Sequence, residues 1–335
     1  MKSILVSRTD RIGDLILSTP VFETLKKSYP DCHLGVLVNE GTEELLRHSP
    51  WVDEIICYKL SNFFQLIRTL RKFEVAIILY PLFTIAFLCW LSRIKLRIGT
   101  AYRYYSFFFN RKVKQHRKYC RTHEAECNVK LLRPLGIERS SITPRIWFSK
   151  AEREWARQRL KELRARGMIA ALHPGSGGSS RRWSEENFAT LGDILSENGF
   201  EVLLTGSVKE TELIEHIISR MKSSPIKVVG ETSLLRLAAL FTLCKVLITN
   251  STGPMHLAAS CEIPVIGIFC PIAGCSPQRW APLGRNTGVL IPDVPVCQKC
   301  VLRRCEHYDC MNLITPEMVL RKVQQLLIDS EEGDE

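Results

Sequence analysis

Residues 245–259 read KVLITNSTGPMHLAA: an apolar run, a polar turn and then a segment typical of a helix. Lys245–Thr249 has the length and the β-branched composition of a buried strand. Ser251 or Thr252 can cap the helix that follows, and Pro254 suits its first turn. A strand that leads directly into a helix is the repeating unit of a parallel α/β sheet. This stretch therefore predicts the fold class of the region around it.

The same alternation continues on both sides of this stretch, in two halves separated by an irregular region. In the second half it predicts further strands at Ile169–His173, Glu201–Thr205, Lys227–Val229 and Pro264–Phe269. In the first half it predicts a helix over Leu15–Ser28 and strands at Ser3–Ser7, His33–Val38, Glu54–Tyr58 and Val75–Leu79. Right-handed crossovers between such strands build parallel sheets. We therefore predict an α/β protein with two domains, residues 1–150 and 151–313, followed by a helical segment, residues 314–335.

The composition is that of a globular protein: 45% of the 335 residues are hydrophobic and 24% are charged, which excludes a disordered or fibrous chain. The net charge of +11 comes from the first half, where residues 1–150 hold 25 Lys and Arg against 13 Asp and Glu. An anionic partner for that half is expected. The longest apolar run, Val75–Leu91, is short for a membrane span, and the residues after Met1 do not resemble a signal peptide.

The loop after the first predicted strand, Arg8–Asp14, is the first candidate for chemistry. It lies at the carboxyl end of a parallel sheet, where α/β proteins bind their ligands. Asp14 can act as a general base that faces a ligand, or it can simply cap the following helix. The loop has a single glycine, Gly13, so it lacks the Gly-x-Gly-x-x-Gly fingerprint, and this disfavours an NAD-dependent enzyme.

Three loops of the second half can hold an anion or a nucleotide. His173–Trp183 is rich in Gly and Ser and contains Arg181, which offers backbone N–H groups and a fixed positive charge. Residues 249–256 place a helix start directly after a strand, which suits a diphosphate. Glu210 follows another strand and can accept hydrogen bonds from ribose hydroxyls. A mobile loop, a structural role for His256 and a solvated glutamate are the respective alternatives.

Several ordered motifs together resemble glycosyltransferase family 9, the ADP-heptose:lipopolysaccharide heptosyltransferases. These motifs are Arg8…Ile12-Gly13-Asp14, Arg97-Ile98-Gly99, His123-Glu124, His173-Pro174-Gly175 with Arg181-x-Trp183, Gly206…Glu210 and Thr252-Gly253-Pro254-Met255-His256. The resemblance covers nearly the whole chain. It implies the GT-B architecture, in which two Rossmann-like domains with parallel sheets face a central cleft. It also implies that the terminal helix, here within residues 314–335, crosses back to the first domain.

The resemblance implies an inverting glycosyltransferase that needs no metal or other cofactor for catalysis. Asp14 matches the proposed base, which removes the proton of the acceptor hydroxyl. An ADP-sugar donor would bind the second domain through Ser176, Arg181, Glu210, Ser251, Thr252, Gly253 and His256. Fixed hydrogen-bond donors aimed at the departing diphosphate would lower the barrier. Many family members have Asp where this chain has Ser251, so the transferred sugar is either a heptose or the sugar of another nucleotide-sugar donor.

The first domain would bind the acceptor, a phosphorylated lipid-linked glycan such as a lipopolysaccharide core. The candidate residues are Arg8, Arg11, Gly13, Arg97, Arg111, Lys112, Lys114 and His123. From Val75 to His123 the sequence has ten Lys and Arg and no Asp or Glu. This basic stretch predicts peripheral binding to the anionic inner-membrane surface, and we expect a cytoplasmic protein. A solvated basic face and a nucleic-acid-binding protein are the alternatives; the resemblance itself implies no nucleic acid partner.

Four of the 13 cysteines are clustered as Cys297-x2-Cys300-x4-Cys305-x4-Cys310, and the other nine are scattered singly. Four thiolates in so short a span can bind zinc tetrahedrally or hold an iron–sulfur cluster. Disulfides or free thiols are the alternatives. We predict a structural metal here, separate from catalysis. In the nucleic-acid-binding alternative, the same four cysteines would form a metal knuckle.

Overall fold

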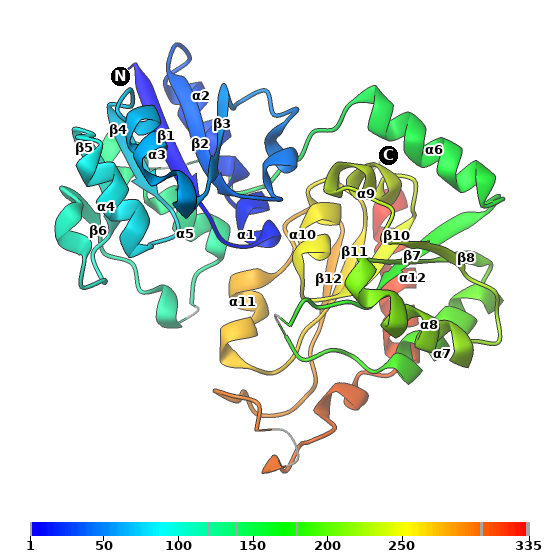
Figure 1. Ribbon diagram of the computed structural model, residues 1–335. Coiled ribbons are helices and arrows are strands. Elements are labelled where there is room, and N and C mark those ends of the chain that lie inside the picture. The colour runs from blue at the N-terminus through cyan, green and yellow to red at the C-terminus, as the bar shows by residue number, and fades with distance from the viewer. Residues whose placement is uncertain (1, 120, 139, 179, 302–303, 333–335) are drawn as a thin grey trace. The chain divides into compact units, whose positions relative to one another are not determined.

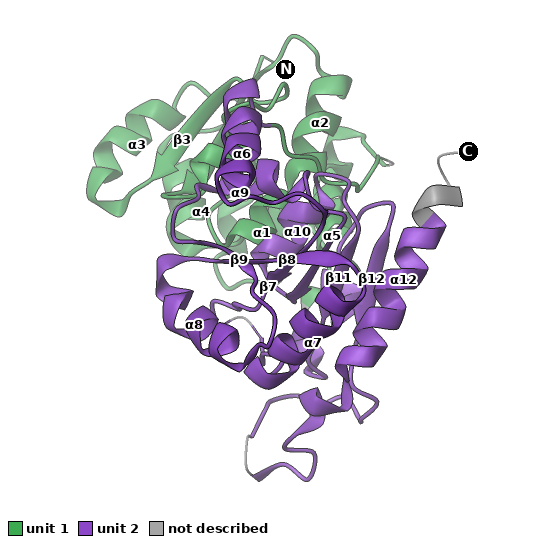
Figure 2. Cartoon of the chain, turned by 90° about the vertical axis from the view of Figure 1, so that its right-hand side faces the viewer, with its two compact units in different colours: residues 1–147 green, residues 148–335 purple. Residues whose placement is uncertain are grey.

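In the computed structural model the chain divides into two compact units, residues 1–147 (unit 1) and 148–335 (unit 2), which Figure 2 distinguishes by colour. The structure describes residues 2–332, except residues 120, 139, 179, 302 and 303. The predicted boundary after residue 150 lies three residues beyond the observed one. Each unit contains a six-stranded sheet, and its paired strands run parallel. The predicted fold class is therefore confirmed, and the cleft between the domains stays a prediction.

The sheet of unit 1 has the strand order β3-β2-β1-β4-β5-β6. Its strands are β1 (Ser3–Arg8), β2 (His33–Asn39), β3 (Glu54–Tyr58), β4 (Val75–Ile78), β5 (Leu96–Thr100) and β6 (Arg111–Val113). Its helices are α1 (Ile12–Ile16), α2 (Thr19–Ser28), α3 (Phe63–Leu70), α4 (Phe83–Leu91) and α5 (Glu124–Lys130). Short turns of 3-10 helix are η1 (Glu43–Leu46), η2 (Leu60–Asn62), η3 (Ser106–Phe108), η4 (Arg117–Tyr119) and η5 (Arg133–Leu135). Helices α3 and α4 pack together, as do α2 and α5 (Figure 1).

The sheet of unit 2 has the strand order β12-β11-β10-β7-β8-β9. Its strands are β7 (Met168–His173), β8 (Phe200–Gly206), β9 (Ile226–Val229), β10 (Val246–Asn250), β11 (Val265–Ile268) and β12 (Thr287–Leu290). Its helices are α6 (Lys150–Glu162), α7 (Glu185–Glu197), α8 (Thr211–Arg220), α9 (Leu234–Phe241), α10 (Gly253–Ala259), α11 (Pro277–Trp280) and α12 (Pro316–Glu332). Its 3-10 turns include η6 (Val208–Glu210), η7 (Ala273–Cys275) and η9 (Cys310–Leu313). Helix α7 packs between α8 and α12, and α9 packs against α6 and α10.

The central strands explain why both sheets are parallel and covered by helices. All five residues of β10 are buried, and so are five of the six residues of β1 and β7. Such strands read as continuous apolar runs because helices cover both faces of the sheet. Residues from β7, β8, β10 and β11 form one core with α7, α8 and α12. The rigid sheet therefore fixes the positions of the loops that leave its strand ends.

Two details differ from the sequence prediction. The helix expected over Leu15–Ser28 is two helices, α1 and α2, because Pro20 lies in the first turn of α2 and cannot continue an α-helix from the preceding turn. The basic region that interrupts the alternation contains two unpredicted strands, β5 and β6, and β12 is a third. These strands are short and lie toward the sheet edges, where a continuous apolar run is not needed.

The apolar run Val75–Leu91 forms strand β4 and helix α4, with residues 79–82 between them. Helix α4 has nine residues. Among the described residues, no helix combines the length and the hydrophobicity that a membrane crossing requires.

Helix α12 belongs to unit 2, where it contacts α7, β11 and β12. Val319 and Val323 on this helix are fully buried in the unit 2 core. The segment just before it is fixed by a hydrogen bond from the indole of Trp183 to the carbonyl of Ile314, at 2.8 Å. The predicted return of residues 314–335 to the first domain stays a prediction.

We expect Ile314→Ala to lower the free energy of unfolding by about 2–5 kcal/mol, because Ile314 is fully buried and truncation leaves a cavity. The adjacent Leu313 is 52% exposed, so Leu313→Ala provides a matched control with an expected change within about 0.5 kcal/mol. Urea unfolding of both variants measures the difference. Equal effects would contradict the packing of this segment against unit 2.

Candidate functional site

In each unit, the strand order places the candidate loops at the edge of the sheet where ligands are expected to bind. In unit 1 the chain builds outward from β1 to β2 and β3 and then returns to β4 on the other side of β1. In unit 2 it builds from β7 to β8 and β9 and returns to β10 on the other side of β7. Ligands of open parallel sheets bind at the carboxyl ends of the strands where the order reverses in this way. The loops after β1, β7 and β10 are therefore the best placed for binding.

A buried arginine organises the loop after β1. The side chain of Arg8 is only 2% exposed, and it forms ion pairs with three carboxylates. Its guanidinium donates to Asp10 at 2.7 and 2.9 Å, to Glu124 at 3.0 Å and to Asp14. It also donates to the amide oxygen of Asn128 at 2.9 Å. These contacts connect the end of β1 to α1 and to the start of α5.

The charges and the burial of this cluster shift the pKa values of Arg8 and Asp10. Burial works to lower the pKa of Arg8, but the carboxylates of Asp14, Asp10 and Glu124 raise it, so the guanidinium stays protonated. Burial also raises the pKa of Asp10 to about 6; Arg8 opposes this shift and the neighbouring Asp14 adds to it. Asp10 therefore ionises at a higher pH than an ordinary aspartate. The sequence prediction selected Asp14 and overlooked Asp10, although Asp10 is only two residues from Arg8.

The structure brings some of the predicted acceptor residues together around this cluster. Asp14 is half-buried in α1, Gly13 is buried in the same helix and Arg11 is exposed at its N-cap. His123 caps α5, where its Nδ1 accepts a hydrogen bond from the backbone N–H of Ala125 at 3.2 Å. The cap places His123 next to Glu124, the buried partner of Arg8.

The other predicted acceptor residues lie on β5 and β6. Arg97 uses its guanidinium within its own unit, donating to the carbonyl of Phe108 at 2.7 Å and to the carbonyl of Ile94. These two hydrogen bonds explain where the guanidinium of Arg97 lies. Arg111, Lys112 and Lys114 are exposed at the sheet edge. They are the predicted acceptor residues best placed to meet a large anionic surface.

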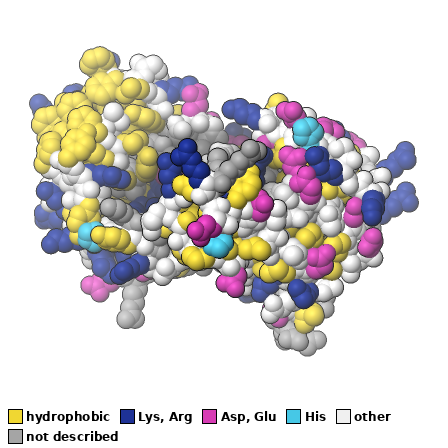
Figure 3. Space-filling model, turned by 90° about the horizontal axis from the view of Figure 1, so that it is seen from below, with side chains coloured by type: hydrophobic (Ala, Val, Ile, Leu, Met, Phe, Trp, Pro, Cys, Tyr) yellow, Lys and Arg dark blue, Asp and Glu magenta, His cyan; other side chains and the backbone are white. Residues whose placement is uncertain are grey.

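Exposed aromatic side chains lie on the same unit. Trp90 is 48% exposed, Phe107 66% and Tyr104 81%. They continue into a ring cluster in which Phe83 stacks on Tyr104 and Phe87 stacks on Trp90, with centroids 6.2 and 5.9 Å apart. Figure 3 shows hydrophobic side chains gathered on one region of unit 1, with Lys and Arg side chains nearby. We call the exposed side chains Phe83, Trp90, Tyr104 and Phe107 the aromatic patch.

In unit 2 one asparagine holds two candidate loops in place. The amide group of Asn250, at the end of β10, donates to the carbonyl of Pro174 at 2.7 Å. Its oxygen accepts from the backbone N–H of Trp183 at 2.9 Å. Asn250 is fully buried, so both contacts are shielded from water. The sequence prediction missed this residue, and its place directly before Ser251 was the available signal.

Glu210 and His173 lie close together beside the same loop. Glu210 forms a capping box in which its Oε2 accepts from the backbone N–H and the hydroxyl of Ser207, both at 2.8 Å. The Nε2 of His173 is 4.0 Å from this Oε2, and its Nδ1 is 3.0 Å from the hydroxyl of Thr205. Burial lowers the pKa of His173, while Glu210 acts in the opposite direction. A Cβ on Gly175 would lie 1.8 Å from Glu210 Oε1, so only glycine allows this close approach.

The predicted phosphate-binding residues gather at the start of α10. Thr252 is the N-cap and Gly253 is the first helical residue. The hydroxyl oxygen of Thr252 is buried and makes no hydrogen bond to any described residue. The backbone N–H of Ser251 donates to the carbonyl of Ile268 at 3.0 Å, which fixes the turn. His256 and Ser176 are both buried, the first within α10 and the second after β7.

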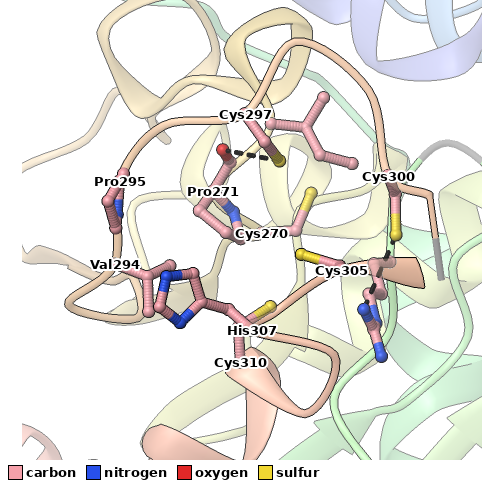
Figure 4. A pocket seen from close by; sticks show the side chains of 11 residues that line it. Cys270, Pro271, Val294, Pro295, Cys297, Cys300, Cys305, His307 and Cys310 are labelled. Atoms are coloured by element: carbon pink, nitrogen blue, oxygen red, sulfur yellow. Dashed lines mark hydrogen bonds between the residues drawn. The ribbon is translucent and has the colours of Figure 1, made fainter. Parts of the chain in front are cut away.

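Arg181 lies against the cysteine-rich region. Its Nη1 is 3.5 Å from the sulfur of Cys300, and its guanidinium lies 5.0 Å from the ring centre of Tyr308. It lines a hollow with all four clustered cysteines and with Cys270. Figure 4 shows this hollow, which we call the thiol pocket. Its described lining is Arg181, Cys270, Pro271, Ile272, Val294, Pro295, Cys297, Cys300, Cys305, His307 and Cys310.

The positions of the cysteines support the predicted metal only in part. Cys297, Cys300, Cys305 and Cys310 do line one pocket. Within the described part of the chain, however, no three His, Cys, Asp or Glu side chains are grouped as a single metal ion requires. By sequence, Cys270 is one of the scattered cysteines, because it lies 27 positions before Cys297. A hydrogen bond with Cys275 and others with backbone N–H groups lower the pKa of Cys270 to about 6, against the effect of burial.

Two Rossmann-like units, each with polar loops at the carboxyl edge of a parallel sheet, form the GT-B fold. Residues 63–310 match glycosyltransferase family 9 (heptosyltransferase). The chain belongs to this family. It is 28% identical over 275 residues to lipopolysaccharide heptosyltransferase 3 of Escherichia coli K12, covering 77% of this chain and 79% of that one.

Solved structures share the fold over almost the whole chain. A glycosyltransferase family 9 protein from Veillonella parvula aligns with a TM-score of 0.86 and 23% identity, covering 98% of this chain and 97% of that one. The ADP-heptose lipopolysaccharide heptosyltransferase II of E. coli aligns with a TM-score of 0.81 and 22% identity, covering 99% and 100%. The family match confirms the family predicted from the motifs, and these structures confirm the GT-B fold.

The raised pKa of Asp10 predicts a pH-dependent contribution to stability. Its carboxyl group has a pKa of about 6 in the folded chain against an ordinary value of 3.8, so folding favours the protonated form. The stability of the wild type relative to Asp10→Asn should therefore fall as the pH rises from about 4 to about 6, and then level off. Chemical unfolding of both proteins across this range measures the difference. Asp31→Asn, at an exposed position, is the control, and a flat difference for Asp10→Asn would contradict the shift.

Proposed function

We propose that this chain is an inverting heptosyltransferase that transfers a heptose from ADP-heptose to a lipopolysaccharide core or a related phosphorylated glycan, with Asp14 as general base. The observation that carries the proposal is the carboxylate of Asp14, held by the buried Arg8 at the carboxyl edge of β1 in a chain of family 9. A base at this position faces the region where open parallel sheets bind ligands.

Asp14 would remove the proton of the acceptor hydroxyl while that oxygen attacks the anomeric carbon of the donor. The bond between this carbon and the diphosphate breaks in the same displacement, so the configuration inverts. Arg8 orients the carboxylate of Asp14 and is itself held by Asp10 and Glu124. A base that is fixed before the substrate arrives avoids the entropic cost of ordering it during the reaction.

Unit 2 would bind the donor. Glu210 would accept hydrogen bonds from the ribose hydroxyls, beside Gly175 and His173. The buried hydroxyl of Thr252 and the backbone N–H groups from Gly253 onward would contact the diphosphate. Ser176 and His256 lie on the loops and the helix that border this position, and Arg181 would add a positive charge after a shift from its contact with Tyr308.

The departing diphosphate gains negative charge in the transition state. Arg181 and the N–H groups at the start of α10 would stabilise this charge in the place that a divalent cation occupies in other transferases. We therefore propose that the transfer step uses no metal and that any metal at the cysteines has a structural role.

The heptose itself is supported by relatives. The E. coli enzyme that aligns over nearly the whole chain is described as an ADP-heptose lipopolysaccharide heptosyltransferase. Ser251 differs from the aspartate of many family members, so the donor sugar is best tested directly against other nucleotide sugars.

We also propose that unit 1 binds a membrane surface from the cytoplasmic side. Arg111, Lys112 and Lys114 are exposed, and the aromatic patch lies on the same unit. Basic side chains attract anionic lipid headgroups, and exposed aromatic rings favour the interface between headgroups and acyl chains. Such a surface would hold the enzyme next to a lipid-linked acceptor.

Asp14→Asn should lower kcat by about 10²–10⁴-fold, because the amide keeps the shape of the carboxylate but cannot accept the proton. It should preserve the thermal stabilisation by ADP, because Asp14 lies outside the proposed donor site. Turnover is measured with ADP-heptose and a lipopolysaccharide core acceptor, and binding is measured by thermal shift.

Asp31→Asn is the matched control, because Asp31 is an exposed aspartate of the same unit, and its turnover should equal that of the wild type. Full activity of Asp14→Asn would exclude Asp14 as the base. Stabilisation by UDP or GDP in place of ADP would keep the fold but exclude ADP-heptose as the donor.

Replacing Arg111, Lys112 and Lys114 by Gln should weaken binding to anionic vesicles by about a hundredfold, at about 1 kcal/mol for each charge near the surface. Cosedimentation with vesicles of anionic and of neutral lipids measures the effect. The control replaces Arg157, Lys161 and Arg166 by Gln. These residues are exposed on unit 2, so the control removes the same amount of positive charge. Equal losses in the two triple variants would show that the attraction is not specific to unit 1.

A further inference from the structure

The thiol pocket combines cysteines that are far apart in the sequence. Cys270 follows β11 and is fully buried, while Cys310 opens η9 and is also buried. Cys297, Cys300 and Cys305 lie on the chain between β12 and η9. All five are free thiols in the structure. Protein interiors are normally filled. A hollow lined by five thiols therefore indicates space for a bound group.

The chain from residue 298 to 309, which we call the excursion, links Cys297 to Cys310. Its described residues are all exposed or half-buried, including Val301 at 49% and Tyr308 at 37%. Its two ends are fixed to unit 2, and within it Cys300 and Tyr308 contact Arg181. At one end, Cys297 pairs with Ile272 in a β-bridge, and its N–H donates to the carbonyl of Pro271 at 2.8 Å. At the other end, Cys310 and Met311 enter the core of unit 2. Segments without a core of their own are commonly stabilised by a metal or by disulfides.

The thiols of the pocket have different surroundings. The sulfur of Cys300 contacts Arg181 at 3.5 Å, and in Figure 4 it lies to one side of the others. The sulfurs of Cys270, Cys297, Cys305 and Cys310 lie near the middle of the same view. Two of these, Cys270 and Cys310, belong to the folded core of unit 2, and Cys305 belongs to the excursion. A group bound to these four would connect the excursion to the end of the sheet.

We propose that the thiol pocket holds a four-iron, four-sulfide cluster whose thiolate ligands are Cys270, Cys297, Cys305 and Cys310. A single zinc ion would need its sulfurs at about 2.3 Å from one point, and no three ligand side chains among the described residues are grouped in that way. A cluster binds each cysteine at a different iron atom, so its four sulfurs stand around a hollow. The thiol pocket offers such a hollow, with apolar walls formed by Pro271, Ile272, Val294 and Pro295.

The charges around the pocket suit this occupant. Each of the four thiols loses its proton when its sulfur binds iron, so the loaded site carries negative charge. The described lining includes Arg181 and no carboxylate, so a positive charge lies beside the negative charge of the site. Arg181 and Cys300 thus lie beside the proposed cluster and are not among its ligands.

The test is a metal and sulfide analysis of the full-length chain, produced in iron-supplied cells and purified without oxygen. We expect about four iron and about four acid-labile sulfide ions per chain, with broad visible absorption that disappears on oxidation. Cys270→Ser and Cys305→Ser should each lose most of the iron and sulfide. Cys300→Ser and Cys57→Ser should retain them, since Cys300 is a neighbour of the cluster and Cys57 lies in unit 1.

Several results would overturn the proposal. They are the absence of iron and sulfide from the wild type, one zinc ion per chain without sulfide, and disulfides among these cysteines in the anaerobic protein. Loss of iron from Cys300→Ser together with retention in Cys270→Ser would overturn the ligand set. Cys305 is in the excursion, outside the packed core, so Cys305→Ser keeps the test decisive even if Cys270→Ser fails to fold. None of these measurements depends on sugar transfer, so they test the cluster independently of the proposed heptosyltransferase activity.

Discussion

The buried positive charge of Arg8 is the constraint on which the site of unit 1 depends. A guanidinium that is 2% exposed has lost almost all of its water, and an unpaired charge in that position would strongly destabilise the fold. The chain compensates by bringing Asp10 and Asp14 from the loop after β1 and Glu124 and Asn128 from α5. The same compensation orients the carboxylate that we propose as the base, so structure and chemistry share one set of contacts.

In unit 2, hydrogen bonds hold the candidate loops in place. There the buried amide of Asn250 joins the end of β10 to both ends of the loop after β7, at Pro174 and at Trp183. Glu210 closes the other side, against Gly175. The result is a set of loops held by hydrogen bonds, with a helix start nearby, which suits a ligand that brings its own negative charge. A carboxylate cluster in one unit and a helix start in the other match the two halves of a glycosyl transfer, which need a base and a diphosphate site.

The sequence predicted the parts that depend on continuous local patterns. The strands of both sheet centres could be identified because parallel strands buried on both faces are unbroken apolar runs, as in Val246–Asn250. Short strands near the edges, such as Arg111–Val113, carry exposed charges and gave no such signal. Pro20 was a visible signal for the break between α1 and α2, but the apolar spacing on both sides of it suggested one helix.

For the candidate site, the sequence by itself determined the family and the loops, because Arg8, Asp14, Arg181 and Thr252 stand in short motifs at the ends of predicted strands. It could not determine which residues meet across the fold. The pairing of Arg8 with Glu124 spans 116 residues, and Asn250 reaches Pro174 across 76. Cys270 joins the clustered cysteines only because β11 ends beside the chain that contains Cys297. Such contacts depend on the order of strands in the sheet, and the packing of the whole chain decides that order.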